Sequence, residues 1–322
     1  MIVARTIAET RAALRSLPRP LGFVPTMGAV HEGHLSVVDA AKTRCASVAA
    51  SVFVNPPQFG RGEDYKAYPR DEARDFALFG DRGVDLVFTP RAEEMYAGGF
   101  ATQLHVGGPL TETYEGASRA GHFDGVAVIV VKLLNVVQPE VLFLGEKDAQ
   151  QLAVVRRLLR DLDLPVDVVG VPTVREPDGL AMSSRNAYLT PEERAVAPNL
   201  YRALLAGRAA AGAPGATPKD IVVAAASALL VPAAPESEAE RVAAQRGEAP
   251  PAAPRFALDY LAIVDADTFL PRSTLGPRSQ LIAAARLGAT RLIDNVTLSD
   301  SAYPAKDATT WKKGHNGSAH RE

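Results

Sequence analysis

LGFVPTMGAVHEGH, residues 21–34, joins an apolar run to the start of a helical pattern. Its first six residues predict a strand over 21–26, and the spacing that follows predicts a helix over 34–45. Two glycines and two histidines lie between them: Gly28, Gly33, His31 and His34. Glycine lets the backbone approach a ligand closely, and a helix N-terminus carries unpaired N–H groups that attract anions. The stretch therefore predicts a strand–turn–helix unit with a phosphate site at the turn.

Two other interpretations of this turn compete with the phosphate site. Two histidines four positions apart on one helix face would indicate a zinc hydrolase. Here they are three positions apart, and Gly33 immediately precedes the second. A turn whose histidines only stabilise local structure is the stronger alternative, and the other motifs of the chain decide against it.

The first half of the chain alternates strand and helix patterns. Strands are predicted over 21–26, 46–54, 86–89, 141–144 and 167–171, and helices over 34–45, 71–81, 125–137 and 148–162. Apolar strands alternating with amphipathic helices are typical of a parallel sheet covered on both faces. Such sheets bind ligands at the carboxyl ends of strands, near a topological switch point. We expect an α/β domain with a doubly wound parallel sheet over 1–175.

The pattern changes after about residue 175. Thr190, Pro191 and Glu193 form a helix start with a capping box, and two helical stretches follow, the second over 217–230. Strands are predicted over 256–264, 280–287 and 290–295, with a tight turn at Gly288-Ala289. We expect a smaller α+β domain over 176–296, interrupted by an Ala/Pro-rich linker or loop at 231–254, and a disordered tail over 297–322.

Composition excludes several classes of protein. The 35 basic and 37 acidic residues nearly balance, so no bulk attraction to nucleic acid or anionic lipid is implied. Cys45 is the only cysteine, which excludes an internal disulfide and cysteine-cluster metal sites. The N-terminus does not resemble a secretory signal, and no apolar run approaches the ~20 residues that cross a bilayer. We expect a cytoplasmic protein without a membrane or nucleic-acid partner.

Three further polar loops follow strands or precede helices. Asn55 and Gln58 flank two prolines that stiffen the loop, and such rigid amides suit a small polar substrate. The stretch 145–151 (GEKDAQQ) offers Lys147 for phosphate oxygens, Asp148 for a helix cap or ribose hydroxyls, and Gln151 one turn further. The stretch 182–185 (MSSR) combines hydroxyls and a guanidinium as a phosphate clamp. Each loop alone also fits an ordinary turn, but their joint occurrence indicates a nucleotide.

Other polar residues have less defined roles. Arg119, His122 and Asp124 form a cluster before a helix. Tyr65, Tyr68 and Arg70 fit either a lid or a subunit contact, and His105, in a strand-like run, fits a structural role.

The His-x-Gly-His core resembles the signature of the nucleotidyltransferase superfamily. The wider set of motifs resembles the pantoate–β-alanine ligase (pantothenate synthetase) family. The resembling blocks are PTMGAVHEGH at 25–34, FVNPPQFG at 53–60, YPRD at 68–71, GHFDGV at 121–126, GEKDAQQL at 145–152 and VPTVREPDGLAMSSRNAYL at 171–189. The resemblance spans about residues 1–205 and returns at 257–296 with DYL and RLGATRLIDN. Ala149, Pro57 and Ala120 depart from residues common in that family, which affects fine positioning rather than the reaction.

The resemblance implies a fold, a reaction and a set of site residues. Members of this family couple pantoate to β-alanine with ATP and Mg²⁺, giving pantothenate, AMP and pyrophosphate. It implies a cytoplasmic homodimer with a Rossmann-like N-terminal domain and a C-terminal lid domain. Gln58 and Gln151 would hold pantoate, and Gln58 would also reach β-alanine. The residues implied at ATP are Met27, Gly28, Ala29, Val30, His31, Glu32, Gly33, His34, Gly145, Glu146, Lys147, Asp148, Val174, Met182, Ser183, Ser184 and Arg185.

The corresponding mechanism has two steps. The pantoate carboxylate attacks the α-phosphorus of ATP, and the amine of β-alanine then displaces AMP. His34, in a protonation state that the sequence leaves open, would stabilise the α-phosphate with help from His31. Lys147 and Arg185 would hold the departing phosphates, and Mg²⁺ would travel on the nucleotide without a protein ligand.

Two other functions stay open at this point. An adenylyltransferase acting on a phosphorylated cofactor precursor would share the His-x-Gly-His turn, but not Gln58 and Gln151. A non-enzymatic nucleotide-binding regulator would bind ATP and release no pyrophosphate.

Overall fold

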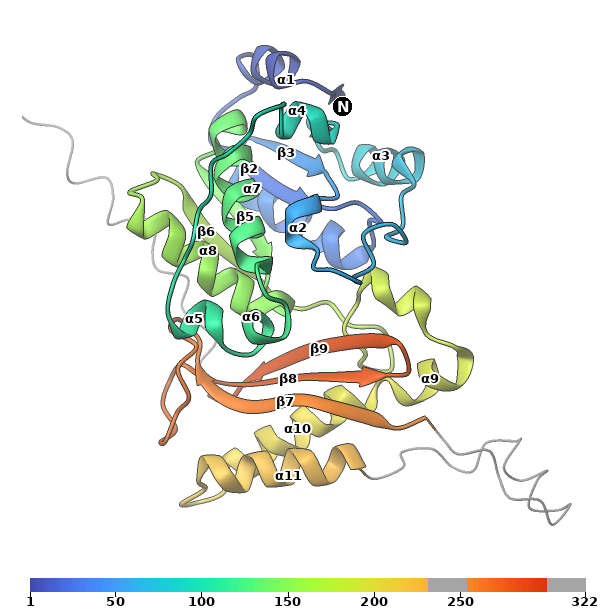
Figure 1. Cartoon of the computed structure of the whole chain (residues 1–322), viewed down its shortest axis with the longest axis vertical. Coiled ribbons are helices and arrows are strands. Elements are labelled where there is room, and N and C mark those ends of the chain that lie inside the picture. The colour runs from blue at the N-terminus through green and yellow to red at the C-terminus, as the bar shows by residue number, and fades with distance from the viewer. Residues whose placement is uncertain (231–253, 300–322) are drawn as a thin grey trace, which may run out of the picture.

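The computed structural model describes residues 1–230 and 254–299, and their larger part is a parallel sheet. Its strands are β1 (Ile2–Ala4), β2 (Leu21–Thr26), β3 (Ser47–Val52), β4 (Leu86–Phe88), β5 (Val141–Gly145) and β6 (Asp167–Val171). They lie in the order β1-β4-β3-β2-β5-β6, and every neighbouring pair is parallel (Figure 1). The chain leaves β2 toward β3 and β4, then crosses back to place β5 on the other side of β2. The sheet is therefore doubly wound, with its switch point between β2 and β5.

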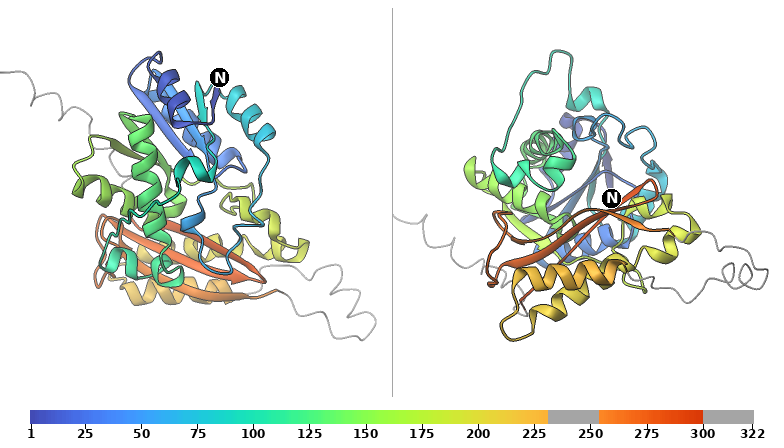
Figure 2. Two further views of the ribbon diagram at one scale, coloured as in Figure 1. Left: turned by 45° about the horizontal axis from the view of Figure 1, so that its top comes forward. Right: turned by 60° about the horizontal axis from the view of Figure 1, so that its bottom comes forward.

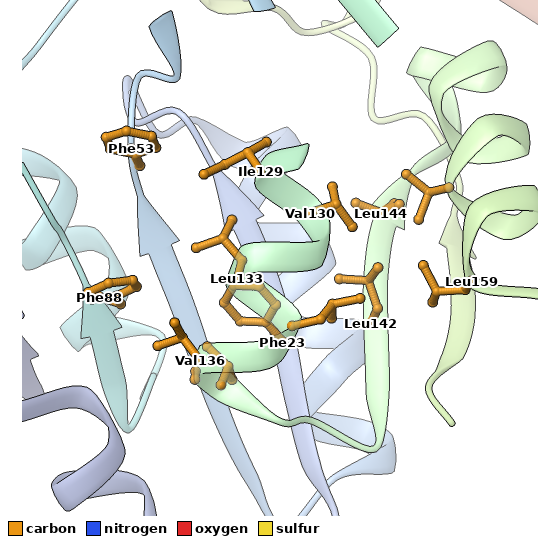
Figure 3. Packing of buried hydrophobic residues seen from close by; sticks show 14 of the residues in the cluster. Phe23, Phe53, Phe88, Ile129, Val130, Leu133, Val136, Leu142, Leu144 and Leu159 are labelled. Carbon is orange, nitrogen blue, oxygen red and sulfur yellow. The ribbon is translucent and has the colours of Figure 1, made fainter. Parts of the chain in front are cut away.

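Helices cover both faces of this sheet, as the alternation of apolar strands and amphipathic helices predicts. The helices are α1 (Ile7–Leu14), α2 (Glu32–Arg44), α3 (Glu72–Asp81), α7 (His122–Val137) and α8 (Ala149–Asp161). Phe23 and Leu142 pack with α1, α7 and α8 on one face, where Figure 3 shows Leu133 of α7 beside them. The next residues along the strands, Val24 and Phe143, pack with α2 and α3 on the other face. Successive side chains of a strand point to opposite faces, so each strand serves both cores.

Some elements of this part differ from the sequence expectation. Strand β1 was not predicted, because its three residues gain their stability from pairing with β4 at the sheet edge. The short helices α4 (Ala92–Met95), α5 (Pro109–Glu112) and α6 (Glu115–Ser118) also lack a periodic signal. His105 lies in irregular backbone instead of a strand, where it is exposed and its Nδ1 is 2.9 Å from Oδ1 of Asp124.

A smaller α+β part follows, as predicted. It holds the antiparallel strands β7 (Phe256–Asp265), β8 (Ser279–Leu287) and β9 (Thr290–Thr297), in that order. Gly288, with φ of 57°, makes the tight turn between β8 and β9. The helices are α9 (Pro191–Val196), which begins with the expected capping box at Thr190, α10 (Asn199–Ala211) and α11 (Pro218–Leu230). Helices α10 and α11 cover the outer face of the sheet (Figures 1 and 2).

The inner face of the small sheet packs on the first part of the chain. Val264, Phe269 and Ile282 form one cluster with Phe123 of α7 and Val154 of α8. Nδ2 of Asn295, on β9, also donates to the backbone oxygens of residues 146 and 147, at 2.9 and 3.0 Å. The small sheet is thereby fixed over the loop that follows β5.

Two sequence expectations fall partly or wholly outside the described residues. The Ala/Pro-rich linker or loop is described only at Pro254, and the expected tail only over 297–299. There Thr297 ends β9, and the Leu298 N–H donates to Ser279 O at 2.9 Å, so the ordered chain extends beyond its predicted end.

Within the described ranges, none of the helices is both long and apolar enough to span a membrane.

Candidate functional site

A cavity of about 240 Å³ lies at the switch point between β2 and β5. Its walls come from the segments after β2, β3, β5 and β6, which the parallel topology brings to one edge of the sheet. Most of the residues implied by the resemblance line it: Met27, His31, Gly33, His34, Gln58, Gly145, Lys147, Asp148, Gln151, Val174, Met182, Ser183, Ser184 and Arg185. Four loops far apart in sequence therefore meet at one cavity.

Five residues expected at ATP do not line this cavity: Gly28, Ala29, Val30, Glu32 and Glu146. Gly28 and Ala29 both have positive φ, 83° and 51°, and the N–H groups of Ala29 and Val30 point to one carboxylate. That carboxylate belongs to Asp75, which accepts from Ala29 N at 2.9 Å and Val30 N at 2.8 Å. Glu32 points to Arg82 at 2.7 Å. The imidazoles of the turn therefore line the cavity, while two of its backbone N–H groups donate to a buried carboxylate.

Asp75→Asn should destabilise the protein by about 1–3 kcal/mol, the cost of an unsatisfied buried polar group. The amide would place a donor against one of the two N–H groups of the turn, where the carboxylate now accepts both. Urea unfolding measures the effect. Asp81→Asn, an exposed position on the same helix α3, is the matched control, and equal stability losses at the two positions would contradict the role of Asp75.

The two imidazoles adopt defined tautomers. Nδ1 of His31 accepts from Gly33 N at 3.1 Å, and Nδ1 of His34 accepts from His31 N at 3.3 Å. The proton of each neutral ring is therefore on Nε2, the nitrogen free to donate to a ligand. Burial, followed by the positive charge of Lys147, lowers the pKa of His31 to about 4. Burial, followed by His31 and Lys147, lowers that of His34 to about 3, so both rings are neutral at pH 7 before a ligand binds.

A hydrogen-bond relay fixes the amide of Gln58. Burial raises the pKa of Tyr96 to about 12, so its hydroxyl keeps its proton and donates to Oδ1 of Asn55 at 2.6 Å. Nδ2 of Asn55 then donates to Oε1 of Gln58 at 3.1 Å, which leaves Nε2 of Gln58 as the donor beside Met27. A Cβ at Gly125 of α7 would come within 2.6 Å of Pro57, so only glycine permits this close approach to the loop. The prolines alone do not set the direction of Gln58.

Apolar side chains of α7 close one side of the cavity, and the sequence did not identify them as site residues. They are Val126, Ile129, Val130 and Leu133. This helix is apolar on nearly all sides, so periodicity could not separate residues that face a ligand from residues that face the core. Asn55, Tyr68, Arg119 and His122 also line the cavity. A pocket with an apolar wall and a few oriented polar groups is typical of a small-molecule site.

A second cavity of about 610 Å³ lies between the small sheet and the first part of the chain. The two cavities adjoin, because both are lined by Arg119, His122, Lys147, Asp148, Gln151, Ser183 and Arg185. Asp148 makes no capping hydrogen bond to α8, so its carboxylate is available to a ligand. Lys147 and Arg185 outweigh the effect of burial and hold the pKa of Asp148 below its usual value.

Arg185 is placed at this junction but is engaged by the protein itself. Its Nε and Nη2 donate to the two oxygens of Asp64, both at 3.0 Å. A phosphate must therefore use the remaining N–H groups of this guanidinium, on Nη1 and Nη2, or replace Asp64. Ser184 is likewise bonded to Tyr68, at 3.2 Å between the two hydroxyl oxygens. The loop over 60–70 and the loop over 182–185 thus close together over the site.

The arrangement has the groups that acyl-phosphate chemistry needs. Two N–H-donating imidazoles, a lysine and an arginine border one space and can neutralise phosphate charge. Oriented amides and an apolar wall lie beside them and can bind a small hydroxy acid.

Comparison with known proteins supports this interpretation. Residues 2–297 match the family model described as pantoate-beta-alanine ligase. A pantothenate synthetase from Thermus thermophilus is 53% identical over 297 residues, covering 92% of this chain and 99% of the relative. One from Chloroflexus aggregans is 49% identical over 298 residues, with 92% and 99% coverage.

Solved structures agree with this match. The crystal structure of the Thermus thermophilus pantothenate synthetase has a TM-score of 0.82 and 52% identity, covering 92% of this chain and 99% of that one. A Francisella tularensis pantoate-beta-alanine ligase, complexed with beta-gamma ATP and beta-alanine, has a TM-score of 0.71 and 29% identity, covering 92% and 98%. The chain belongs to the pantoate-beta-alanine ligase family.

Proposed function

We propose that this chain joins pantoate to β-alanine at the expense of ATP, giving pantothenate, AMP and pyrophosphate through a pantoyl adenylate. The observation that carries the proposal is the placement of His31, His34 and Lys147 around the same cavity as Gln58 and Gln151. Phosphate-binding and substrate-binding groups within one cavity are what attack of a carboxylate on the α-phosphorus requires. The identity of the two substrates, pantoate and β-alanine, is inferred from membership of the family.

In the first step two anions must meet, so charge neutralisation and positioning dominate. Gln58 and Gln151 hold pantoate against the apolar wall of α7, with its carboxylate toward the nucleotide. Nε2–H of His34 donates to the α-phosphate as a P–O bond forms to pantoate and the bond to pyrophosphate breaks, and His31 assists. Lys147 and the Ser183–Arg185 loop hold the departing phosphates. Asp148 binds the ribose hydroxyls.

In the second step the neutral amine of β-alanine attacks the adenylate carbonyl, and AMP leaves. The adenylate must be protected from water, and the two loops that close over the site are suited to this. Mg²⁺ would enter bound to ATP and help to neutralise the phosphate charge, because Mg²⁺ bound to phosphates commonly needs few protein carboxylates. We assign it no protein ligand.

A pyrophosphate-release assay on the purified protein tests the proposal. With ATP and pantoate alone, bound adenylate should form with a single burst of pyrophosphate. Addition of β-alanine should convert the burst into steady turnover with AMP as product. Pyrophosphate release that requires a phosphorylated cofactor precursor would indicate an adenylyltransferase, and ATP binding without release would indicate a regulator.

Gln58→Ala should raise the KM values for pantoate and β-alanine by about 10-fold or more and leave ATP binding nearly unchanged. The substitution removes one oriented amide from the acid-binding side of the cavity, and a lost hydrogen bond to a charged group costs about 1.5–3 kcal/mol. Steady-state kinetics with each substrate varied in turn gives the three values. If the affinity for ATP alone changed, this assignment of Gln58 would be wrong.

The proposal extends to assembly and location, which the family resemblance implies. We propose that the chain acts as a cytoplasmic homodimer; light scattering on the purified protein tests the dimer.

A further inference from the structure

Arg119 stands where the two cavities meet and is held by three contacts. Its Nε and Nη2 donate to the carboxylate of Glu63 at 2.9 and 2.7 Å, the two-point geometry of an arginine–carboxylate pair. Its Nη1 is 3.1 Å from Nε2 of His122, and its Nη2 is 3.4 Å from the backbone oxygen of Gln58. Arg119 lines both cavities, whereas Glu63 lines only the larger one.

The surroundings of Arg119 fix its position relative to Gln58. Nδ1 of His122 lies 2.8 Å from the backbone oxygen of Gln58, which can only accept, so this nitrogen carries the proton of the neutral ring. Nε2 of His122 therefore accepts from Arg119. Arginine, histidine and the backbone of Gln58 form one continuous chain of hydrogen bonds. The guanidinium is thus anchored beside the residue that holds pantoate.

The second substrate poses a binding problem that the motif residues do not solve. The amine substrate carries a carboxylate that stays ionised and takes no part in bond formation. Lys147 and Arg185 lie with the phosphate-binding loops, and the triphosphate needs their charge. Of the three cations shared by the two cavities, Arg119 is the one whose guanidinium lies within hydrogen-bonding distance of the backbone of Gln58.

We propose that Arg119 binds the carboxylate of the incoming amino acid at the mouth of the smaller cavity, where Glu63 now occupies the guanidinium. The inference rests on the proposed ligase function and deepens it by naming the group that selects an amino acid over a plain amine. Glu63 and Arg119 side chains are 24% and 18% exposed, so the pair is reachable from the larger cavity. Glu63 follows Gly62, where a Cβ would meet nothing within 4 Å, so this side of the turn faces open space.

With its carboxylate on Arg119, the amino acid points its amine toward the adenylate carbonyl beside Gln58. The nitrogen forms a C–N bond to that carbonyl carbon, and the carbon–oxygen bond to AMP breaks. AMP leaves with the electron pair, and the extra N–H proton passes to solvent. No further reactant is needed.

The test compares β-alanine with 3-aminopropan-1-ol, an amine of the same length that has a neutral hydroxyl in place of the carboxylate. Kinetics are measured at saturating ATP and pantoate for the unsubstituted protein and for Arg119→Gln, Arg119→Lys and Glu63→Gln. Arg61→Gln is the matched control, since Arg61 lies on the same loop, is exposed and also lines the larger cavity. Pyrophosphate release without any amine is measured in parallel for each protein.

Arg119→Gln should raise the KM for β-alanine about 10- to 100-fold and leave that for the neutral amine unchanged. For Arg119→Lys, the KM for β-alanine should lie between those of the unsubstituted protein and Arg119→Gln, because lysine keeps the charge without the planar fork. Glu63→Gln should lower the KM for β-alanine by removing a competing carboxylate. Arg61→Gln should change the KM for neither amine.

Two results would overturn the inference. If Arg119→Gln raised the KM for both amines equally, Arg119 would only position Gln58. If only the KM for ATP rose, Arg119 would bind phosphate. Failure of the proposed function has a separate signature. In that case the unsubstituted protein would release no pyrophosphate with ATP and pantoate, whatever amine follows.

Discussion

Replacing His34 with alanine should slow formation of the pantoyl adenylate by about 10²–10³-fold, the usual effect of losing one donor to a developing oxyanion. The ring is neutral before ATP binds, and its Nδ1 accepts from the backbone of His31, so Nε2–H is its only donor. Alanine removes that donor at the point where negative charge concentrates on the α-phosphate. Single-turnover release of pyrophosphate from ATP and pantoate measures this step without interference from the second one.

Glu32→Ala is the matched control for His34→Ala. Glu32 belongs to the same motif, but its carboxylate is paired with Arg82 on the surface and does not line the cavity. It should therefore release pyrophosphate at the unsubstituted rate. A His34→Ala protein that retained this rate would remove His34 from the chemistry, and a large loss in Glu32→Ala would contradict the geometry of the turn.

Much of the fold could be predicted because the strands of a doubly wound sheet are buried on both faces. β2 and β6 occupy the predicted ranges, since apolar runs of this length flanked by helical patterns leave few alternatives. Strand β1 and the helices α4 to α6 were missed because three or four residues carry no periodic signal and depend on tertiary contacts. The sequence pattern therefore predicts long elements, whereas short elements depend on tertiary packing that the pattern does not show.

The candidate site shows the same division. The motifs identified which loops meet, because loops after parallel strands share one edge of the sheet. They could not show that Asp75 accepts from the backbone N–H groups of residues 29 and 30, that Asp64 engages Arg185, or that Tyr96 orients Asn55. Each of these partners lies at least 40 residues away along the chain, where spacing carries no information. A sequence motif therefore gives the members of a site, and the structure gives their protonation and pairing.

Acid should destabilise this protein steeply between pH 6.5 and about 4. The pKa values of His31, His34 and His122 are lowered from 6.5 to about 4, 3 and 4, in each case chiefly by burial. Below pH 6.5 the unfolded chain binds three protons that the folded chain does not, so stability present above that pH is lost as pH falls. Each histidine adds about 1.4 kcal/mol per pH unit to the slope. The free energy of unfolding of a domain is typically about 5–15 kcal/mol, so the loss caused by three such histidines is a large fraction of it.

His122→Asn isolates one of the three contributions. Asparagine can keep the donor to the backbone oxygen of Gln58, where Nδ1 of His122 now lies at 2.8 Å, but it cannot titrate. Urea unfolding of both proteins at several pH values from 7 to 5 should show a lower stability for the variant at pH 7. Its dependence on pH should be shallower, by an amount that approaches about 1.4 kcal/mol per unit as the pH falls well below 6.5. Parallel curves would mean that His122 already accepts a proton in the folded protein, and its hydrogen bonds from Arg119 and to Gln58 could then not be oriented as described.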